Sequence, residues 1–142
     1  MIDERHLPRS HRDMVALVDA HPLAWVISRD FQATLLPLLA ETDDEGGLCA
    51  LLGHIPVRNP QRLALERDPD ALILFLGPND YISPRLVSNP QWGPTWNYEA
   101  LRVRAQVEFV GTRPTWRCGC SLRTSNLAVT GRWREWARGT SA

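Results

Sequence analysis

Two short segments of the sequence carry the residue types that could bind a cofactor. The first runs from Gly53 to Pro60, reads GHIPVRNP, and places Arg58 and Asn59 between a predicted strand and a predicted helix. Backbone N–H groups at a helix start and a guanidinium group both suit an anionic phosphate. The same pattern is also typical of a helix cap beside a solvated arginine, and the residues alone leave both interpretations open.

The second segment runs from Gly77 to Tyr98 and reads GPNDYISPRLVSNPQWGPTWNY. Its four prolines exclude a regular helix, so an ordered loop or a series of turns is predicted. Long loops that carry aromatic and polar residues often contain functional sites. This segment is therefore the strongest candidate for binding.

Residue spacing reveals no catalytic constellation and no metal site. Serine, histidine and acidic residues are present, but no G-x-S-x-G sequence supports a Ser-His-Asp triad. Glycine-rich phosphate-binding sequences of the G-x-G-x-x-G or P-loop type are missing as well. The three cysteines, Cys49, Cys118 and Cys120, include no C-x-x-C, which predicts neither a disulfide framework nor a zinc site.

The elements that must position these residues follow from hydrophobic periodicity. Helices are predicted at 11–20, after the capping residue Ser10, and at 60–67, after a proline suited to a first helical turn. Strands are predicted at 23–28 and 32–40 as a hairpin, at 48–55, at 71–76 as a run buried on both faces, and at 101–109 as a half-buried alternating strand. This order of elements predicts an antiparallel β-barrel with small helices packed around it.

Composition and charge divide the chain. The 142 residues are 44% hydrophobic and 23% charged, as in a globular domain. Residues 1–110 contain 10 Arg and 15 acids, a net charge of −5, whereas residues 111–142 contain 6 Arg and one acid, a net charge of +5. We therefore predict a domain at 1–110 and an atypical basic tail at 111–142.

Two explanations compete for the tail: a genuine basic arm, or a segment read out of frame, which its Arg, Trp, Cys, Ser and Gly content favours. In the second case the barrel lacks its closing strands, the strand at 101–109 has an unpaired edge, and the tail is disordered.

The expected location is the cytoplasm. The first residues, MIDERHLPRSHRD, are charged throughout, and no apolar run reaches the roughly 18 residues of a membrane span.

Four stretches give the chain a resemblance to a known family: Ala33–Leu39 (ATLLPLL), Leu52–Pro60 (LGHIPVRNP), Gly77–Pro84 (GPNDYISP) and Pro94–Tyr98 (PTWNY). In their order and approximate spacing they resemble the PaiB-type FMN-binding proteins, labelled negative transcriptional regulators. The resemblance implies a mainly β fold with some α, a split β-barrel with small flanking helices. It also implies a homodimer that holds FMN at its interface.

The resemblance also implies roles for particular residues. Arg58 and Asn59 become candidates for the FMN phosphate or ribityl chain. Four residues are expected to form hydrogen bonds with the ribityl hydroxyls or the isoalloxazine edge: Tyr81, Ser83, Thr95 and Asn97. Trp96 is expected to stack on the ring or to flank it. His54 is expected nearby. For Tyr81, Trp96 and Asn97, core packing or a turn is the alternative role.

The sequence departs from the family in three places. Leu35 occupies a position where many relatives have histidine, the bridge at 85–93 is shorter and less basic, and residues 111–142 do not match the family's ending.

Three functions follow as hypotheses. The first is an FMN-binding protein, with flavin-linked redox activity as an extension. The second is a DNA-binding negative regulator, although the charge of −5 on residues 1–110 opposes contact with a phosphate backbone. The third is a truncated relative that binds nothing. No catalytic residue is assigned, and the substrate, redox partner and regulated gene are beyond the sequence.

Overall fold

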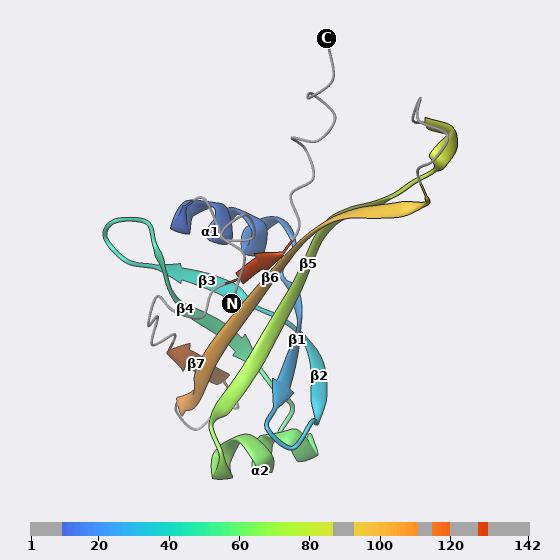
Figure 1. Ribbon diagram of the computed structural model, residues 1–142. Helices are drawn as coiled ribbons and strands as arrows, with labels where there is room; N and C mark the ends of the chain where they lie inside the picture. Colours follow the sequence, from blue (N-terminus) through green and yellow to red (C-terminus); the bar gives the residue numbers. More distant parts are fainter. Residues whose placement is uncertain (1–9, 87–92, 111–114, 120–127, 131–142) are drawn as a thin grey trace.

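The computed structural model describes residues 10–86, 93–110, 115–119 and 128–130 (Figure 1). Within these residues, two α-helices, a short 3-10 helix and eight strands follow one another. The helices are α1 (His11–Ala20), α2 (Pro60–Arg67) and η2 (Pro84–Leu86). The strands are β1 (Leu23–Ser28), β2 (Ala33–Pro37), β3 (Leu39–Thr42), β4 (Leu48–His54), β5 (Asp70–Ile82), β6 (Thr95–Val110), β7 (Thr115–Gly119) and β8 (Ala128–Thr130).

The strands form one curled antiparallel sheet in the order β2-β1-β5-β6-β7-β4-β3, and β8 adds to β6. The two ends of this order, β2 and β3, follow each other in the chain but pair with different partners. Leu38 between them is fully buried, and its N–H donates to the carbonyl of Pro22 at 2.9 Å. The barrel is therefore open between β2 and β3, which is the split-barrel architecture that the resemblance implies.

Alternating side chains of the strands fill the barrel, and α1 lies against β3, β4 and β5 (Figure 1). Ser10 begins α1 as predicted, because its hydroxyl accepts from the N–H of Asp13 at 3.2 Å. The largest buried side chains are Phe75, Met14, Leu38, Leu48, Leu51, Ile55, Ile73 and Leu101. This core explains why the amphipathic stripe of α1 and the alternation of β6 are visible in the sequence.

A buried glutamine holds α2 against the hairpin of β1 and β2. Gln61 is 1% exposed, and its amide nitrogen donates to the carbonyls of Val26 and Gln32, each at 2.8 Å. These bonds compensate for burying the amide nitrogen, whereas the carbonyl oxygen of Gln61 is buried without a partner among the described residues. Gln61 therefore fixes the position of the segment that contains Arg58 and Asn59.

The turn between β1 and β2 is organised around Asp30. The hydroxyl of Ser28 and the amide of Gln32 both donate to its carboxylate at 2.6 Å. These bonds, with that of Ser28 first, hold the pKa of Asp30 below its usual value.

The predicted single strand at 32–40 is wrong. The structure divides it into β2 and β3, because the chain crosses from one side of the split to the other at Leu38. A continuous apolar run cannot reveal this crossing, since Leu36 before Leu38 and Ala40 after it pack against the same core.

The segment 77–98 is also different from the predicted loop. β5 continues to Ile82 and pairs with Thr95–Tyr98 of β6, so the described part forms a two-stranded ribbon. The register shifts where Gly77 and Pro78 lie opposite Glu99, which is the pattern of a β-bulge. A β-carbon on Gly77 would lie 3.2 Å from that of Glu99 and 3.3 Å from Leu17 Cδ1, so glycine permits the close approach of α1.

The unpaired edge of β6 expected for an out-of-frame tail is not found where β7 and β8 cover it. β7 pairs with β6 from Gln106 to Val110 and with β4 from Ala50 to His54, and β8 pairs with β6 from Ala100 to Arg102. A five-residue strand held by backbone bonds on both sides needs no apolar alternation, so the sequence pattern did not reveal it. Residues 111–114, 120–127 and 131–142 lie outside the described residues. The domain division at residue 110 and the out-of-frame origin of the tail stay predictions, the latter testable on the nucleotide sequence around codon 110.

Candidate functional site

Four strands present an apolar surface on the side of the sheet that faces away from the core. Cross-strand pairing gives one row of Leu35, Trp25, Leu74 and Arg102, and a second row of Ala33, Ile27, Leu72 and Arg104. We call these two rows, together with Leu23 and Leu76 at their end, the outer face. Trp25 is 49% exposed, Leu23 53% and Leu76 57%, so large apolar side chains remain in contact with solvent.

This surface departs from the predicted burial of residues 71–76 on both faces. Ala71, Ile73 and Phe75 point into the core, whereas Leu72 and Leu74 are only partly buried and Leu76 is exposed. In the single chain, therefore, residues 71–76 are not buried on both faces, because no described residue covers the side of β5 that carries its leucines. Contiguous exposed apolar surface of this kind marks a binding or interaction site.

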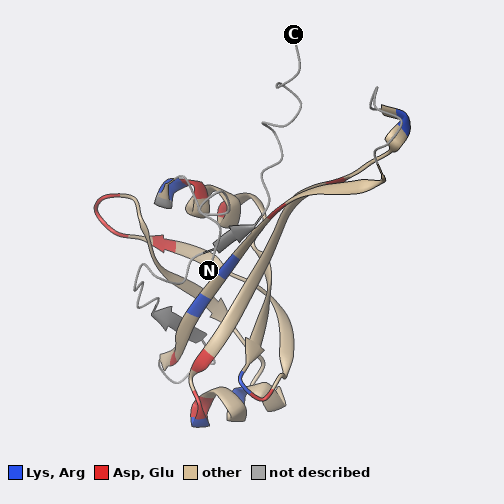
Figure 2. Cartoon of the chain, viewed as in Figure 1, with Lys and Arg blue, Asp and Glu red and all other residues tan. Residues whose placement is uncertain are grey.

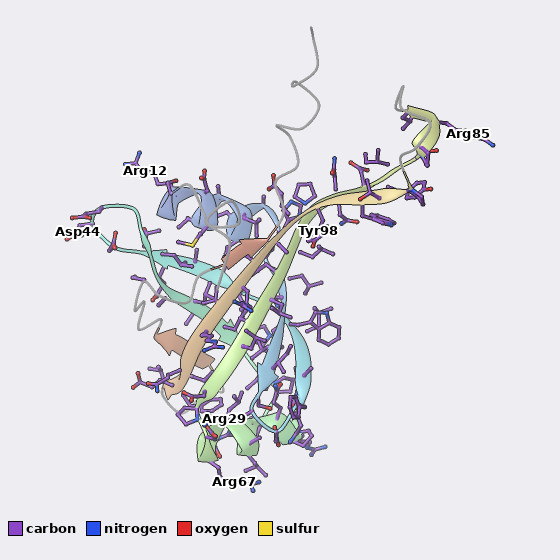
Figure 3. The ribbon with its side chains drawn as sticks, in the orientation of Figure 1. Arg12, Arg29, Asp44, Arg67, Arg85 and Tyr98 are labelled. Atoms are coloured by element: carbon purple, nitrogen blue, oxygen red, sulfur yellow. The ribbon has the colours of Figure 1, made fainter. Side chains whose placement is uncertain are left out.

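The ribbon of β5 and β6 extends away from the barrel beyond the bulge (Figure 1). We call this extension, Asn79–Ile82 with Thr95–Tyr98, the arm. Figure 3 shows Tyr98 where the ribbon leaves the barrel and Arg85 at the far end, with Arg29 and Arg67 at the opposite end of the molecule. Because side chains alternate along β6, Tyr98 and Trp96 continue the side of the ribbon that carries Arg102.

The arm holds an exposed aromatic pair. Tyr81 and Trp96 are direct cross-strand partners, with ring centroids 6.0 Å apart and an interplanar angle of 60°. This edge-to-face arrangement is a favourable one for aromatic rings. Tyr81 is 51% exposed and Trp96 55%, so neither is a core residue.

The structure divides the predicted arm residues between two sides. Thr95 and Asn97 alternate with Trp96 along β6 and therefore point to the side opposite the aromatic pair. Ser83 follows the end of β5, and its hydroxyl accepts from the N–H of Arg85 at 3.3 Å. One flat ligand on the arm cannot contact all of these side chains from a single strand surface.

Asn59 caps α2, which agrees with the structural alternative left open by the sequence. Its carbonyl oxygen accepts from the N–H of Gln61 at 2.9 Å, and its amide donates to the hydroxyl of Thr34 at 3.0 Å. Arg58 beside it is exposed and forms no hydrogen bond or ion pair with any described residue. Its guanidinium remains available for an anion, while most of the hydrogen-bonding capacity of Asn59 is used internally.

Removal of the Asn59 cap should lower the stability of the protein by a measurable amount. Asn59→Ala removes both bonds and should lower the free energy of unfolding by about 1–2 kcal/mol in urea denaturation. Asn59→Asp keeps an acceptor for the Gln61 N–H and should lose clearly less. An Asn59→Ala protein with unchanged stability and weakened FMN binding would instead give this residue a ligand role.

Arg58 and Asn59 lie far from the arm of their own chain. Asn59 bonds to Thr34, whose row continues through Val26 to Ile73. Tyr81 lies eight residues further along β5, about 26 Å at the usual rise per residue. This span exceeds the length of an FMN molecule, so one FMN cannot join both groups within a chain. His54, expected near them, is exposed at the end of β4.

Trp25, Arg102 and Arg104 are the residues that sequence reasoning missed. The alternation at 101–109 correctly placed both arginines on the outward side, but an outward arginine is usually a solvated one. Figure 2 shows the basic positions of β6 beside uncharged stretches of β5 and β1. The apolar run ALILFL on the neighbouring strand β5 could have pointed to these residues. A strand that is apolar on both faces needs other groups to cover both faces, and Trp25, Arg102 and Arg104 lie beside its outer one.

The donor set fits FMN in chemical terms. Exposed aromatic rings on the arm suit the isoalloxazine ring, and unpaired guanidinium groups suit its phosphate. The described residues contain no group of three or more acids, histidines or cysteines placed to hold a metal ion. Within the same residues no helix is long and apolar enough to cross a membrane.

Comparisons with known proteins point to the same cofactor. A family model described as "putative FMN-binding domain" matches residues 1–135. The Bacillus subtilis (strain 168) protein named "Protease synthase and sporulation protein PAI 2" is 38% identical over 78 residues, which are 55% of this chain and 36% of that protein. The match therefore spans little more than a third of the relative.

A solved structure supports the fold. It is described as a "putative 5-nitroimidazole antibiotic resistance protein" from Bacteroides thetaiotaomicron VPI-5482, and it superimposes with a TM-score of 0.58 over 87% of this chain and 84% of that chain, at 10% identity. At this identity the likeness concerns the fold alone. The family match over residues 1–135 shows that the chain belongs to this PaiB-type family of FMN-binding domains, and the solved structure supports its split-barrel fold.

Proposed function

We propose that this protein binds FMN between two copies of the chain, with the outer face and the arm as its binding surface. The observation that carries the proposal is the continuity of these two surfaces on one side of the β5 and β6 ribbon. Leu23, Trp25 and Leu76 supply exposed apolar area, and the ribbon leads from them to the aromatic pair of the arm.

A second copy is the natural cover for the outer face. Symmetric dimers bury the same patch of both subunits, and the fully buried centre of such an interface is apolar and rich in aromatic residues. The run ALILFL is typical of a strand covered on both sides, and one chain covers only one side. A homodimer also offers Arg58 of the partner subunit a route to the cofactor that its own chain cannot provide.

In this arrangement each part of the site has a chemical task. The rings of Trp96 and Tyr81 pack against the isoalloxazine ring and exclude water from it, while polar side chains orient its edge. Thr95 and Asn97 point to the other side of the arm, where they are placed to bond the cofactor of a second site or the partner chain. FMN itself supplies one- and two-electron redox chemistry when bound, so flavin-linked redox activity is part of the proposal.

FMN titration of the purified chain tests the proposal. The protein should quench flavin fluorescence saturably, and Trp96→Ala should weaken binding about tenfold, since an aromatic contact of this kind contributes up to about 1.5 kcal/mol. Phe31→Ala is the matched control, because Phe31 is 90% exposed in the turn between β1 and β2, away from the arm. A folded wild-type chain that takes up no FMN would overturn the proposal.

Regulation by direct DNA contact is a second candidate, and its support is the name of the Bacillus subtilis relative, which refers to protease synthesis and sporulation. Residues 1–110 carry a net charge of −5, and Figure 2 shows basic positions spread over several elements rather than gathered on one. A DNA-binding surface needs clustered positive charge. Salt-sensitive retention of the full chain on duplex DNA would favour this candidate over a purely flavin-linked role. Location in the cytoplasm stays a prediction.

A further inference from the structure

We infer that the contact between Gly77 and α1 sets the direction of the arm, which makes Gly77 and Leu17 positioning residues for FMN binding. The inference rests on the proposed function, because it concerns how the aromatic pair is presented to the cofactor. Gly77 is buried at the base of the arm, where the register of β5 and β6 shifts. Glycine has no side chain with which to bind a ligand, so any role of Gly77 depends on its position.

The β-bulge at the base of the arm fixes the bend of the ribbon. Two residues of β5, Gly77 and Pro78, lie opposite Glu99 alone on β6. A bulge of this kind bends its strand and increases the local twist. The side-chain amide of Asn79 donates to the carbonyl of Gly77 at 3.2 Å, a local bond that holds the bulge in shape. The direction of the arm is therefore decided at these residues.

Helix α1 packs against the bulge without spare room. A β-carbon on Gly77 would lie 3.2 Å from Glu99 Cβ, 3.3 Å from Leu17 Cδ1 and 3.4 Å from the carbonyl oxygen of Glu99. Non-bonded carbon atoms are best placed about 3.5–4.0 Å apart. Leu17 belongs to the buried core, where close packing limits how far it can move. Added volume at Gly77 therefore pushes β5 away from α1 and changes the angle of the bend.

The arm converts a small change at its base into a larger one at the aromatic pair. Tyr81 lies four residues beyond Gly77 on β5, about 13 Å away. No residue of the arm is buried, so packing beyond the base does not hold the arm in one direction. Binding groups must be held within about 0.5 Å of their productive geometry. A tilt of the arm therefore withdraws Tyr81 and Trp96 from the isoalloxazine ring.

FMN titration of Gly77→Val tests the inference. The valine should weaken FMN binding about tenfold, the loss also expected for Trp96→Ala, because the aromatic pair no longer meets the ring. Gly77→Ala adds one methyl group and should give a smaller loss, and it takes the place of the valine variant if that protein does not fold. Gly93→Val is the matched control. A β-carbon on Gly93, next to the arm, meets no atom within 4 Å, so FMN affinity should stay unchanged.

A second substitution separates positioning from a general loss of stability. Leu17→Ala removes the side chain that the valine would meet, so Gly77→Val with Leu17→Ala should recover most of the FMN affinity. Leu65→Ala is the control, because Leu65 is also a buried leucine but lies on α2, far from α1 (Figure 1). Alone it should lower stability through its cavity and leave FMN affinity unchanged, and combined with Gly77→Val it should recover nothing.

Two results would overturn the inference. One is a Gly77→Val protein that is folded by circular dichroism and binds FMN as tightly as the wild type. The other is an FMN affinity that Leu17→Ala restores no better than Leu65→Ala does. A folded wild type that takes up no FMN overturns the proposed function as well, which distinguishes that failure from the other two.

Discussion

In the proposed dimer, Trp25→Arg is expected to separate the two copies, so that the variant runs as a monomer and loses FMN binding with it. Trp25 stands in the middle of the outer face, flanked by Leu35 and Leu74. Tryptophan at the centre of an interface often contributes 2 kcal/mol or more, so the dimer dissociation constant should rise at least about thirtyfold. Size-exclusion chromatography and FMN titration measure the two effects.

Leu63→Arg is the control for this experiment. Leu63 is 57% exposed, close to the 49% of Trp25, but it lies on α2 away from the outer face. Its replacement should change neither the size of the particle nor FMN affinity. A Trp25→Arg protein that stays dimeric and binds FMN normally would show that the outer face is not the interface.

The second large effect is expected for Gln61→Leu, which should lower the free energy of unfolding by about 2–4 kcal/mol. The leucine fits a buried position but removes both donors, and the carbonyls of Val26 and Gln32 lose their bonds to α2. Urea denaturation at equal protein concentration measures the change, since the stability of the proposed dimer would depend on concentration.

Leu63→Gln on the exposed side of the same helix should stay within about 0.5 kcal/mol of the wild type. If Gln61→Leu were equally harmless, the bonds of Gln61 would not hold α2 in place. The position of Arg58 and Asn59 would then depend on the capping contacts alone.

The sequence allowed most of the elements to be predicted, because their signals are local. Ser10 and Pro60 mark the starts of the two α-helices, and the alternation at 101–109 reflects one buried side of β6. The four stretches of family resemblance led to the split barrel, which the comparisons confirm.

Non-local features explain what could not be predicted. The crossing at Leu38 and the bulge at Gly77 depend on contacts with segments distant in the sequence, and β7 depends on two partner strands. Prolines at 78 and 84 indicated a loop, yet a bulge and a strand end accommodate them.

The candidate site was predictable by residue type but not by arrangement. The aromatic pair of the arm lies side by side, while Thr95 and Asn97 point the other way and Arg58 lies at the far end of the barrel. Only strand pairing reveals that Trp25, Leu74 and Arg102 share one row. Sequence patterns within one segment cannot reveal such a row, because the residues of the row come from three different strands.

Sedimentation velocity of the wild-type chain with FMN, recorded in the absorption band of the flavin, tests most directly whether FMN is bound between two copies. If FMN is bound between two copies, the flavin should sediment with a dimer, with one FMN for each chain, and should sediment as free FMN once dilution dissociates that dimer. Flavin that sediments with a monomer, or that remains bound after the dimer has dissociated, would contradict that arrangement.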